Sequence, residues 1–401
     1  MSGHRELIPI ARPLLGDEEA QAVSRALQSG WVSQGPEVAA FEREFAERVG
    51  APHACAVSSC TTALHLALLA VGVQAGDEVV TVSHSFIATA NAIRYCNAVP
   101  VFVDIQPDTY NLDPEKLEAA IGPRTRAVLA VHQLGMPCDL PAILPLAGRY
   151  HLPVVEDAAC AIGSEIRIAD RWEAIGRPHG DIACFSFHPR KVITTGDGGM
   201  LTTHNPEYDR RFRLWRQHSM NVPDTVRHGA SEVIFESYPE LGFNYRMTDI
   251  QAAVGRVQLR RLPDIVRRRR KLGQRYQERL AGIPGLGLPI EPEWARTNWQ
   301  SYCVRLPADR RQQPVMQALL DRGIATRRGV MCAHREAAYP FPTWSCPRRG
   351  ACGCAPYACQ ELQHSERAQD QCIILPLYPQ MTDDDQDRVI LALRQVLDEQ
   401  E

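Results

Sequence analysis

The chain has 401 residues, 45% of them hydrophobic and 23% charged, a composition that fits a globular protein and excludes collagen-like, disordered and membrane-spanning classes. Its 44 Lys and Arg residues against 47 Asp and Glu residues give a net charge of −3 at pH 7, without the basic excess of a general nucleic-acid binder. A chain of this length is expected to form two or three compact units.

Helical and strand patterns alternate through the first two thirds of the chain. Apolar residues recur at helical spacing from Val38 to Val49, and a second helix is predicted over 61–71. Short runs rich in β-branched residues predict strands at 78–82, 99–104, 127–131, 154–156 and 182–187. Buried strands separated by helix-length segments predict an α/β fold, with a mostly parallel sheet flanked by helices.

A long helix is predicted over 256–280, with Pro263 bending it or starting its main part. The basic cluster at 267–271 is expected to be a solvated face of this helix. The Pro- and Gly-rich stretch after it predicts a linker into a smaller C-terminal unit. That unit should contain a strand at 302–306 and helices at 315–322 and 383–397.

The domain prediction follows from this organisation. We expect a large domain over residues 1–280, which includes the N-terminal segment, and a small α/β domain over residues 281–401 with a Cys-rich insertion at 346–359. The N-terminal residues lack the apolar core and cleavage site of a signal peptide, and no stretch approaches the ~18 uninterrupted apolar residues of a membrane span. The expected protein is cytoplasmic and binds neither nucleic acid nor membrane.

The chain has 13 cysteines, an odd number that cannot all pair within one chain. Seven are scattered singly, as expected of reduced thiols in a cytosolic enzyme: Cys55, Cys60, Cys96, Cys138, Cys160, Cys184 and Cys303. Five gather late in the chain: Cys332, Cys346, Cys352, Cys354 and Cys359. The spacing of the last four matches no common zinc motif, so no metal ligand is predicted. A metal-binding interaction module and a loop with incidental or redox-active thiols both stay open.

Polar side chains follow the predicted strands at 154–156 and 182–187 and a further strand that ends at Val57, at the ends where open parallel sheets bind ligands. Ser58 to Thr62 lead directly into a helix, whose free N–H groups suit a phosphate or a simple hydroxyl cap. Asp157 ends an apolar strand, where a carboxylate needs a cationic partner such as a metal or a protonated ring nitrogen. Lys191 lies between a buried strand and a Gly-rich turn, where desolvation is expected to lower its pKa and to favour Schiff-base formation.

These three features together are what pyridoxal phosphate requires: an amine for its aldehyde, an acid for its pyridine nitrogen and donors for its phosphate. Long motifs then resemble one family, the nucleotide-sugar aminotransferases of the DegT/DnrJ type, within the fold type I (aspartate aminotransferase-like) enzymes. The motifs are VSSCTTALHLAL, HSFIATANAI, VPVFVDI, VVEDAACAIGS, FSFHPRKVITTGDGGM and GFNYRMTDIQAAVG. The resemblance spans nearly the whole chain, from Ser29 to Pro379.

The resemblance implies roles for individual residues. Lys191 is implied to form the Schiff base with the cofactor and to shuttle protons, and Asp157 to hold the pyridine nitrogen; with His188 they are the predicted catalytic residues. The other implied cofactor contacts are Phe86 stacked on the ring, Thr61, Thr62 and Ser186 at the phosphate, Cys160, and Asn244 reaching the neighbouring subunit's cofactor in a homodimer. The family commonly has Gln or His at the position of Cys160, and a thiol is a weak donor, so the role of Cys160 is open.

The resemblance also implies a substrate class. The amino donor is expected to be L-glutamate and the acceptor a nucleotide-linked keto sugar, in a ping-pong reaction. The form HPxKxITTGxGG, with His188 before Lys191, resembles enzymes that aminate C4 of 4-keto-6-deoxy sugars. Candidate contacts for the sugar or its diphosphate are Trp31, Gln34, Arg246, Arg328 and His334.

Other activities stay open at this point. A cyclitol ketone or another ring carbon of a nucleotide sugar is an alternative acceptor. A dehydratase relative uses the same cofactor but carries histidine at the lysine position, and Lys191 argues against that activity. A relative without catalysis is expected to lack the lysine, the aspartate or the phosphate ligands, and all are present here.

Overall fold

The computed structural model describes residues 7–222, 231–348, 354–355 and 357–399. The strands are β1 (His53–Val57), β2 (Glu78–Val82), β3 (Val99–Val103), β4 (Thr125–Val131), β5 (Val154–Asp157), β6 (Glu165–Ile168), β7 (Arg171–Ala174), β8 (Ile182–Ser186), β9 (Gly199–Thr203), β10 (Ala295–Arg296), β11 (Tyr302–Arg305), β12 (Arg327–Arg328) and β13 (Cys372–Leu375). The α-helices are α1 (Asp17–Ser29), α2 (Pro36–Val49), α3 (Cys60–Ala70), α4 (Ala88–Tyr95), α5 (Pro114–Ala120), α6 (Leu140–Arg149), α7 (Pro206–Trp215), α9 (Asp249–Leu280), α10 (Gln312–Asp321), α11 (Gln363–Gln371) and α12 (Asp383–Glu399). Short 3₁₀ turns occur at η1 (Gln133–Gly135), η2 (Ala333–Arg335) and η3 (Gln360–Leu362).

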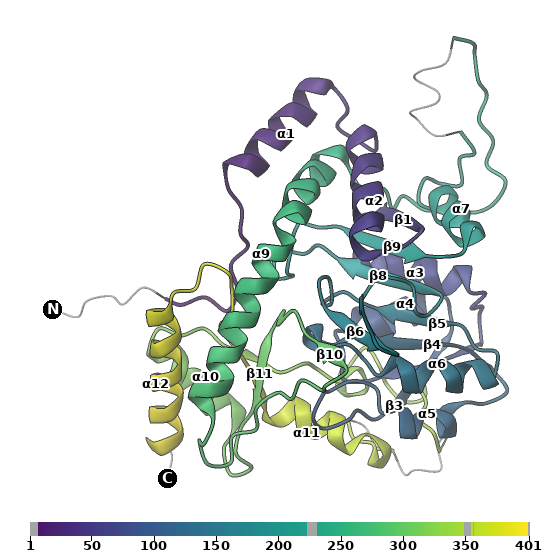
Figure 1. Cartoon of the computed structure of the whole chain (residues 1–401). Coiled ribbons are helices and arrows are strands. Elements are labelled where there is room, and N and C mark those ends of the chain that lie inside the picture. Colours follow the sequence, from purple (N-terminus) through teal and green to yellow (C-terminus); the bar gives the residue numbers. More distant parts are fainter. Residues whose placement is uncertain (1–6, 223–230, 349–353, 356, 400–401) are drawn as a thin grey trace.

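The central sheet has seven strands in the order β1-β9-β8-β5-β4-β2-β3. From β8 to β3 all neighbours are parallel, whereas β9 runs antiparallel to both β8 and β1. Parallel neighbours need crossover connections, which place helices over the sheet (Figure 1). The predicted α/β fold with a mostly parallel, helix-flanked sheet is therefore confirmed, and each strand predicted within it is present.

Both faces of the sheet are buried, which explains the continuous apolar runs of the strands. Along β2, Val79 packs into a core with α3, α4 and α7, and Val80 packs into a second core with α2, α5, α6 and α9. Helix α3 is apolar on almost every side, because it lies between the sheet and neighbouring helices α4 and α7. Its N-terminus is consequently held in a fixed position against the sheet.

Helix α9 begins earlier than predicted, at Asp249 rather than at residue 256, because Thr248 and Gln251 form a capping box there. The expectation that Pro263 starts its main part is wrong, since the helix is continuous through that residue. The expected solvated basic face is also wrong for part of the cluster. Arg269 is buried and donates to the carbonyls of Trp299 and Leu377, because guanidinium groups here satisfy loop carbonyls of the C-terminal unit.

The C-terminal unit has its own antiparallel sheet, β11-β13-β12, covered by α10 and α12. Figure 1 shows α9 running from beside α1 and α2 to α10 and α12. The core of this unit also takes in Tyr276 of α9 and Ile8, whose N–H donates to the Gly323 carbonyl at 2.9 Å. The domain division at 280/281 stays a prediction, and the contacts of Tyr276 and of Ile8 with the C-terminal unit both cross it. Among the described helices, none is long and apolar enough to cross a bilayer.

Candidate active site

Asp157 and Ser186 lie at the same edge of the central sheet. Strands β5 and β8 are parallel neighbours, with Asp157 opposite Cys184, so their carboxyl ends emerge together. Lys191 follows β8 after a turn in which its N–H donates to the carbonyl of His188 at 2.8 Å. Strand order thus brings Asp157 close to Ser186 and Lys191, which follow it by 29 and 34 positions in the chain.

Asp157 is buried and its carboxylate is fixed by two donors. The Thr89 hydroxyl donates to Oδ2 at 2.8 Å, and the Ala159 N–H donates to Oδ1 at 3.2 Å. A buried carboxylate without such donors or a cation would be costly. Thr89 was not among the predicted site residues. It lies four residues after Ser85, with which it shares a 2.7 Å hydrogen bond, but only the adjacency of β2, β4 and β5 brings it to Asp157.

The amine of Lys191 lies 3.0 Å from the sulfur of Cys160. Burial by itself would lower the pKa of Lys191, but the charges of Cys160, Cys60 and Asp157 and the hydrogen bond to Cys160 raise it above its ordinary value. The expected lowering of the Lys191 pKa is therefore wrong for the chain without cofactor. The effects of the cysteine sulfurs and the Asp157 carboxylate on this pKa outweigh that of desolvation. The sequence could not show it, since Cys160 is 31 residues away.

The N-terminus of α3 points at the same edge of the sheet. The Cys60 sulfur donates to the Cys184 carbonyl of β8 at 3.6 Å, which ties this helix end to the strands. A side chain at Gly199 would collide with the backbone of Ser59 and Cys60, so β9 approaches this helix start at backbone distance. Such a helix start offers N–H groups to an anion.

The hydroxyls of this turn are not equivalent. Thr62 donates to the Ser59 carbonyl at 2.7 Å and takes part in a capping box with Ser59, so its hydrogen serves the helix itself. Thr61 and Ser186 are half-buried, and no hydrogen bond of the Thr61 side chain is found among the described residues. The phosphate roles of Thr61, Thr62 and Ser186 stay predictions, and the geometry favours Thr61 over Thr62 as a donor.

Phe86 is 63% exposed in the loop between β2 and α4, an unusual position for a large aromatic ring. Its carbonyl accepts from Thr89 N–H at 3.0 Å, so the loop that presents the ring is linked to the residue that fixes Asp157. An exposed ring held on a rigid loop suits stacking on a flat ligand.

The segment that contains Asn244 and Arg246 lies beside the end of β1. The Tyr245 carbonyl accepts from Ser58 N–H at 2.8 Å, and Arg246 forms a bridge with Val57, so this segment borders the start of α3. Asn244 is exposed, in the position expected of a residue that reaches another subunit, and that contact stays a prediction.

The remaining predicted residues lie in different places. His188 is half-buried, and its Nδ1 accepts from Arg190 N–H at 3.2 Å. Trp31 and Gln34 lie between α1 and α2, where the Gln34 Oε1 is buried without a hydrogen-bond partner among the described residues.

Arg328 is exposed and pairs with Glu336 at 3.2 Å. It lines a cavity of about 530 Å³ beside α10, and none of the predicted cofactor residues lines that cavity. Between the described residues, no hydrogen bond or ion pair joins Arg328 to Lys191.

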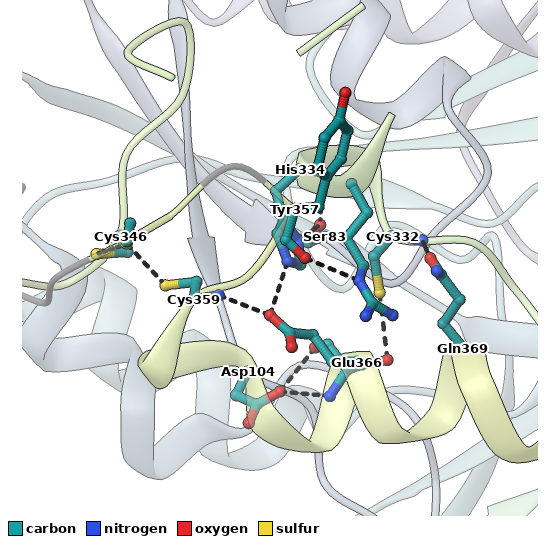
Figure 2. A network of polar contacts seen from close by, with 12 residues as sticks. Ser83, Asp104, Cys332, His334, Cys346, Tyr357, Cys359, Glu366 and Gln369 are labelled. Atoms are coloured by element: carbon teal, nitrogen blue, oxygen red, sulfur yellow. Dashed lines mark hydrogen bonds and ion pairs between the residues drawn. The ribbon is translucent and has the colours of Figure 1, made fainter. Parts of the chain in front are cut away.

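His334 is buried and its two ring nitrogens are both engaged (Figure 2). Nδ1 lies 2.6 Å from the Ser83 hydroxyl and Nε2 lies 3.1 Å from Glu366. Burial lowers the pKa of His334, which favours the neutral ring. Ser83 directly follows β2, the strand that leads to Phe86, so His334 is placed to position that loop, and its predicted contact with a substrate stays a prediction.

The residues present fit pyridoxal phosphate. One edge of the sheet carries a lysine amine, a fixed carboxylate, a helix N-terminus and an exposed aromatic ring, which are the groups this cofactor needs for its aldehyde, ring nitrogen, phosphate and ring face. The charges of Asp157, Lys191 and Cys160 all act on the buried Cys60 thiol: burial raises its pKa most, Asp157 and Cys160 raise it further, and Lys191 lowers it. These groups therefore lie within electrostatic range of one another.

Known proteins match the chain over nearly its whole length. A family model, the DegT/DnrJ/EryC1/StrS aminotransferase family, matches residues 13–394. A curated relative, the spore coat polysaccharide biosynthesis protein SpsC of Bacillus subtilis (strain 168), is 39% identical over 394 residues, 97% of each chain. The solved aminotransferase TlmJ from Streptoalloteichus hindustanus is 34% identical with a TM-score of 0.86, covering 98% of this chain and 99% of that one. The putative sugar aminotransferase Spr1654 from Streptococcus pneumoniae, solved in its PLP form, is 25% identical with a TM-score of 0.86 and the same coverage. The chain is an aminotransferase and belongs to the DegT/DnrJ/EryC1/StrS aminotransferase family.

Proposed function

We propose that this chain transfers an amino group from L-glutamate to the keto group of a nucleotide-linked sugar, with pyridoxal phosphate as cofactor. The observation that carries the proposal is the position of the Lys191 amine, 3.0 Å from Cys160 and at the same sheet edge as Asp157 and the start of α3. Relatives supply the substrate class: SpsC is named for polysaccharide biosynthesis, and Spr1654 is described as a sugar aminotransferase with PLP and PMP forms.

The cofactor supplies an electron sink for the exchange between amine and carbonyl. Asp157, held by Thr89 and Ala159, would pair with the ring nitrogen of the bound cofactor and keep a proton there. Lys191 would hold the cofactor through its aldehyde and, once freed as an amine, would move a proton from the α-carbon of the amino donor to the cofactor carbon that carried the aldehyde; in the second half-reaction it would move a proton from that carbon to the sugar carbon that receives the nitrogen. Phe86 would cover the cofactor ring, and the N–H groups at the start of α3 would hold its phosphate.

The acceptor we propose is a 4-keto-6-deoxy sugar. The support is the motif around His188, a half-buried side chain three residues before Lys191. Arg246, beside the start of α3, is the guanidinium group best placed to hold a diphosphate near this edge. Gln34, whose buried Oε1 lacks a partner among the described residues, is a candidate acceptor for a sugar hydroxyl.

The experiment is a panel of acceptors offered to the amino-loaded enzyme. Protein is incubated with pyridoxal phosphate and L-glutamate, freed of excess donor and mixed with 4-keto and 3-keto nucleotide sugars or an inosose, while the cofactor absorbance is followed. We expect the 4-keto-6-deoxy sugar to restore the starting spectrum fastest, and Lys191→Ala to show no turnover with a fold unchanged by circular dichroism. Faster reaction with the inosose or a 3-keto sugar would overturn the acceptor, and full activity of Lys191→Ala would overturn the mechanism.

A further inference from the structure

Three cysteine sulfurs come together in the segment between η2 and η3. The Sγ atoms of Cys346, Cys354 and Cys359 all lie within 4.8 Å of one another. Cys346 and Cys354 are 3.9 Å apart, and Cys354 and Cys359 are 3.1 Å apart. A tetrahedral zinc site with Zn–S bonds of about 2.3 Å places its sulfurs about 3.8 Å apart. The observed separations bracket that value.

These sulfurs lie in a packed and largely buried environment. Cys346 and Cys359 are buried, and they pack in a small core with Phe102, Trp344 and Leu362. Ser345, directly before Cys346, donates to the Pro100 carbonyl at 2.9 Å and accepts from Phe102 N–H at 2.8 Å, along the edge strand β3. The backbone at Ser345 therefore covers part of the β3 edge of the central sheet.

A polar chain leads from this cluster to Ser83, three residues before Phe86 (Figure 2). The Cys359 N–H donates to Glu366 at 2.6 Å, and the same carboxylate oxygen lies 3.1 Å from His334, which contacts Ser83. In metal sites, groups just outside the ligands commonly orient them in this way. The cluster thus helps to fix the strand end that precedes Phe86.

We propose that Cys346, Cys354 and Cys359 bind a structural zinc ion as thiolates. Zinc is favoured because three clustered thiolates with no histidine or carboxylate among them make a soft donor set, and because zinc needs no redox change to stay bound. The sequence has one more thiol in the segment, Cys352, which lies outside the described residues and is not used in this argument. The aminotransferase reaction does not use the ion.

Oxidised sulfur is the competing chemistry, since Cys354 is disulfide-bonded in the structure. A disulfide joins two sulfurs, and it gives no reason for Cys346 and Cys359 both to approach Cys354. The nine described cysteines outside this cluster are all free thiols. Free thiols in such number are typical of a reducing compartment, where a disulfide is rare and a metal–thiolate site persists.

The test measures metal directly. The full chain is expressed with zinc supplied and purified under reducing, chelator-free conditions, and its metal content is determined by mass spectrometry. We expect about one zinc per chain, nearly none in Cys346→Ser or Cys359→Ser, and an unchanged content in the matched control Cys96→Ser, a buried thiol outside the cluster. Equal zinc in the cluster variants and the control would overturn the proposal, as would a metal-free wild type.

A second measurement needs no variant, in case a cluster variant fails to fold. Wild-type protein is titrated with a thiol-binding mercurial in the presence of a zinc-sensitive dye. Zinc release in step with about three or four thiols, and thiolate-to-cobalt charge-transfer bands after cobalt exchange, are expected. An iron–sulfur absorbance, or a disulfide found by mass spectrometry in the reduced protein, would contradict the zinc assignment.

Discussion

Lys191 and Cys160 form the contact on which the chemistry of this site depends. The sulfur 3.0 Å from the amine occupies the position where related enzymes commonly carry Gln or His, and it acts on the amine by charge rather than by donating a strong hydrogen bond. At this scale the protein controls two protons, one on the lysine and one beside Asp157.

Replacing Cys160 tests the first of these controls. Cys160 raises the pKa of Lys191, and only the neutral amine attacks an aldehyde, so the wild type should take up pyridoxal phosphate faster as the pH rises towards that pKa. We expect Cys160→Ala to shift the midpoint of the uptake rate to lower pH. The measurement is the absorbance change on adding cofactor to cofactor-free protein across a pH series. Cys96→Ala serves as the control, and an identical midpoint in Cys160→Ala would count against a charge effect of Cys160.

Replacing Thr89 tests the control of the proton beside Asp157. Thr89→Val keeps the shape of the side chain but removes the hydrogen bond to the Asp157 carboxylate. A hydrogen bond to a charged group contributes about 1.5 kcal/mol or more, so we expect kcat/KM to fall roughly tenfold, with faster loss of cofactor on dialysis. Thr89→Ser retains the hydroxyl and should recover most of the activity. If Thr89→Ser is as impaired as Thr89→Val, the methyl group rather than the hydroxyl is what matters.

At the scale of elements, one buried ion-pair network holds the strand that leads into α3 in place. Glu42 of α2 accepts from Arg213 at 2.7 Å, from Arg216 and from the Ala56 N–H of β1 at 2.9 Å. Arg216 also donates to the Ala56 carbonyl at 2.7 Å. This joins α2, the end of α7 and β1, the strand that leads into α3, so three elements are fixed by one carboxylate.

Glu42→Gln should therefore destabilise the protein by about 3–5 kcal/mol, because it leaves the buried Arg216 charge without its partner. Burial alone would raise the pKa of Glu42, but Arg216 and Arg213 lower it below its ordinary value of 4.5. Its contribution is present above pH 4.5 and is lost as the pH falls through the lowered pKa. Chemical denaturation at pH 7 measures the loss, and the gap between wild type and variant should shrink in acid.

The control is Glu37→Gln, which breaks a partly exposed pair with Arg256 and should cost at most about 1 kcal/mol. A Glu42 variant no less stable than this control would show that the network is not what holds these elements.

At the scale of the whole molecule, the proposed homodimer shares its active sites. Asn244 is exposed beside the end of β1, while Lys191 and Asp157 lie within their own chain's sheet edge. If Asn244 serves the neighbouring subunit's cofactor, defects in Asn244 and Lys191 lie in different sites of a mixed dimer.

Subunit mixing tests this arrangement. Lys191→Ala and Asn244→Ala homodimers should each be weakly active or inactive, and mixing them under exchange conditions should restore activity, because one site of each mixed dimer is then intact. A mixture of Lys191→Ala with Asp157→Ala is the matched control and should stay inactive, since both residues act in their own chain. Light scattering should give a dimer throughout, and no rescue in the first mixture would contradict sharing through Asn244.

The sequence by itself determined the α/β fold and the strands of its central sheet, because apolar runs of strand length and helical periodicity are local signals. It also marked Lys191, Asp157 and the start of α3, since polar groups directly after buried strands are visible in the chain. Only the tertiary structure decided how these groups act on each other. The order β8-β5-β4-β2 placed Thr89 on Asp157, and packing brought Cys160 to Lys191 and reversed the expected pKa shift. Long-range packing also buried Arg269 and His334 and gathered Cys346, Cys354 and Cys359, because contacts between distant segments follow from the fold and not from the spacing of residues.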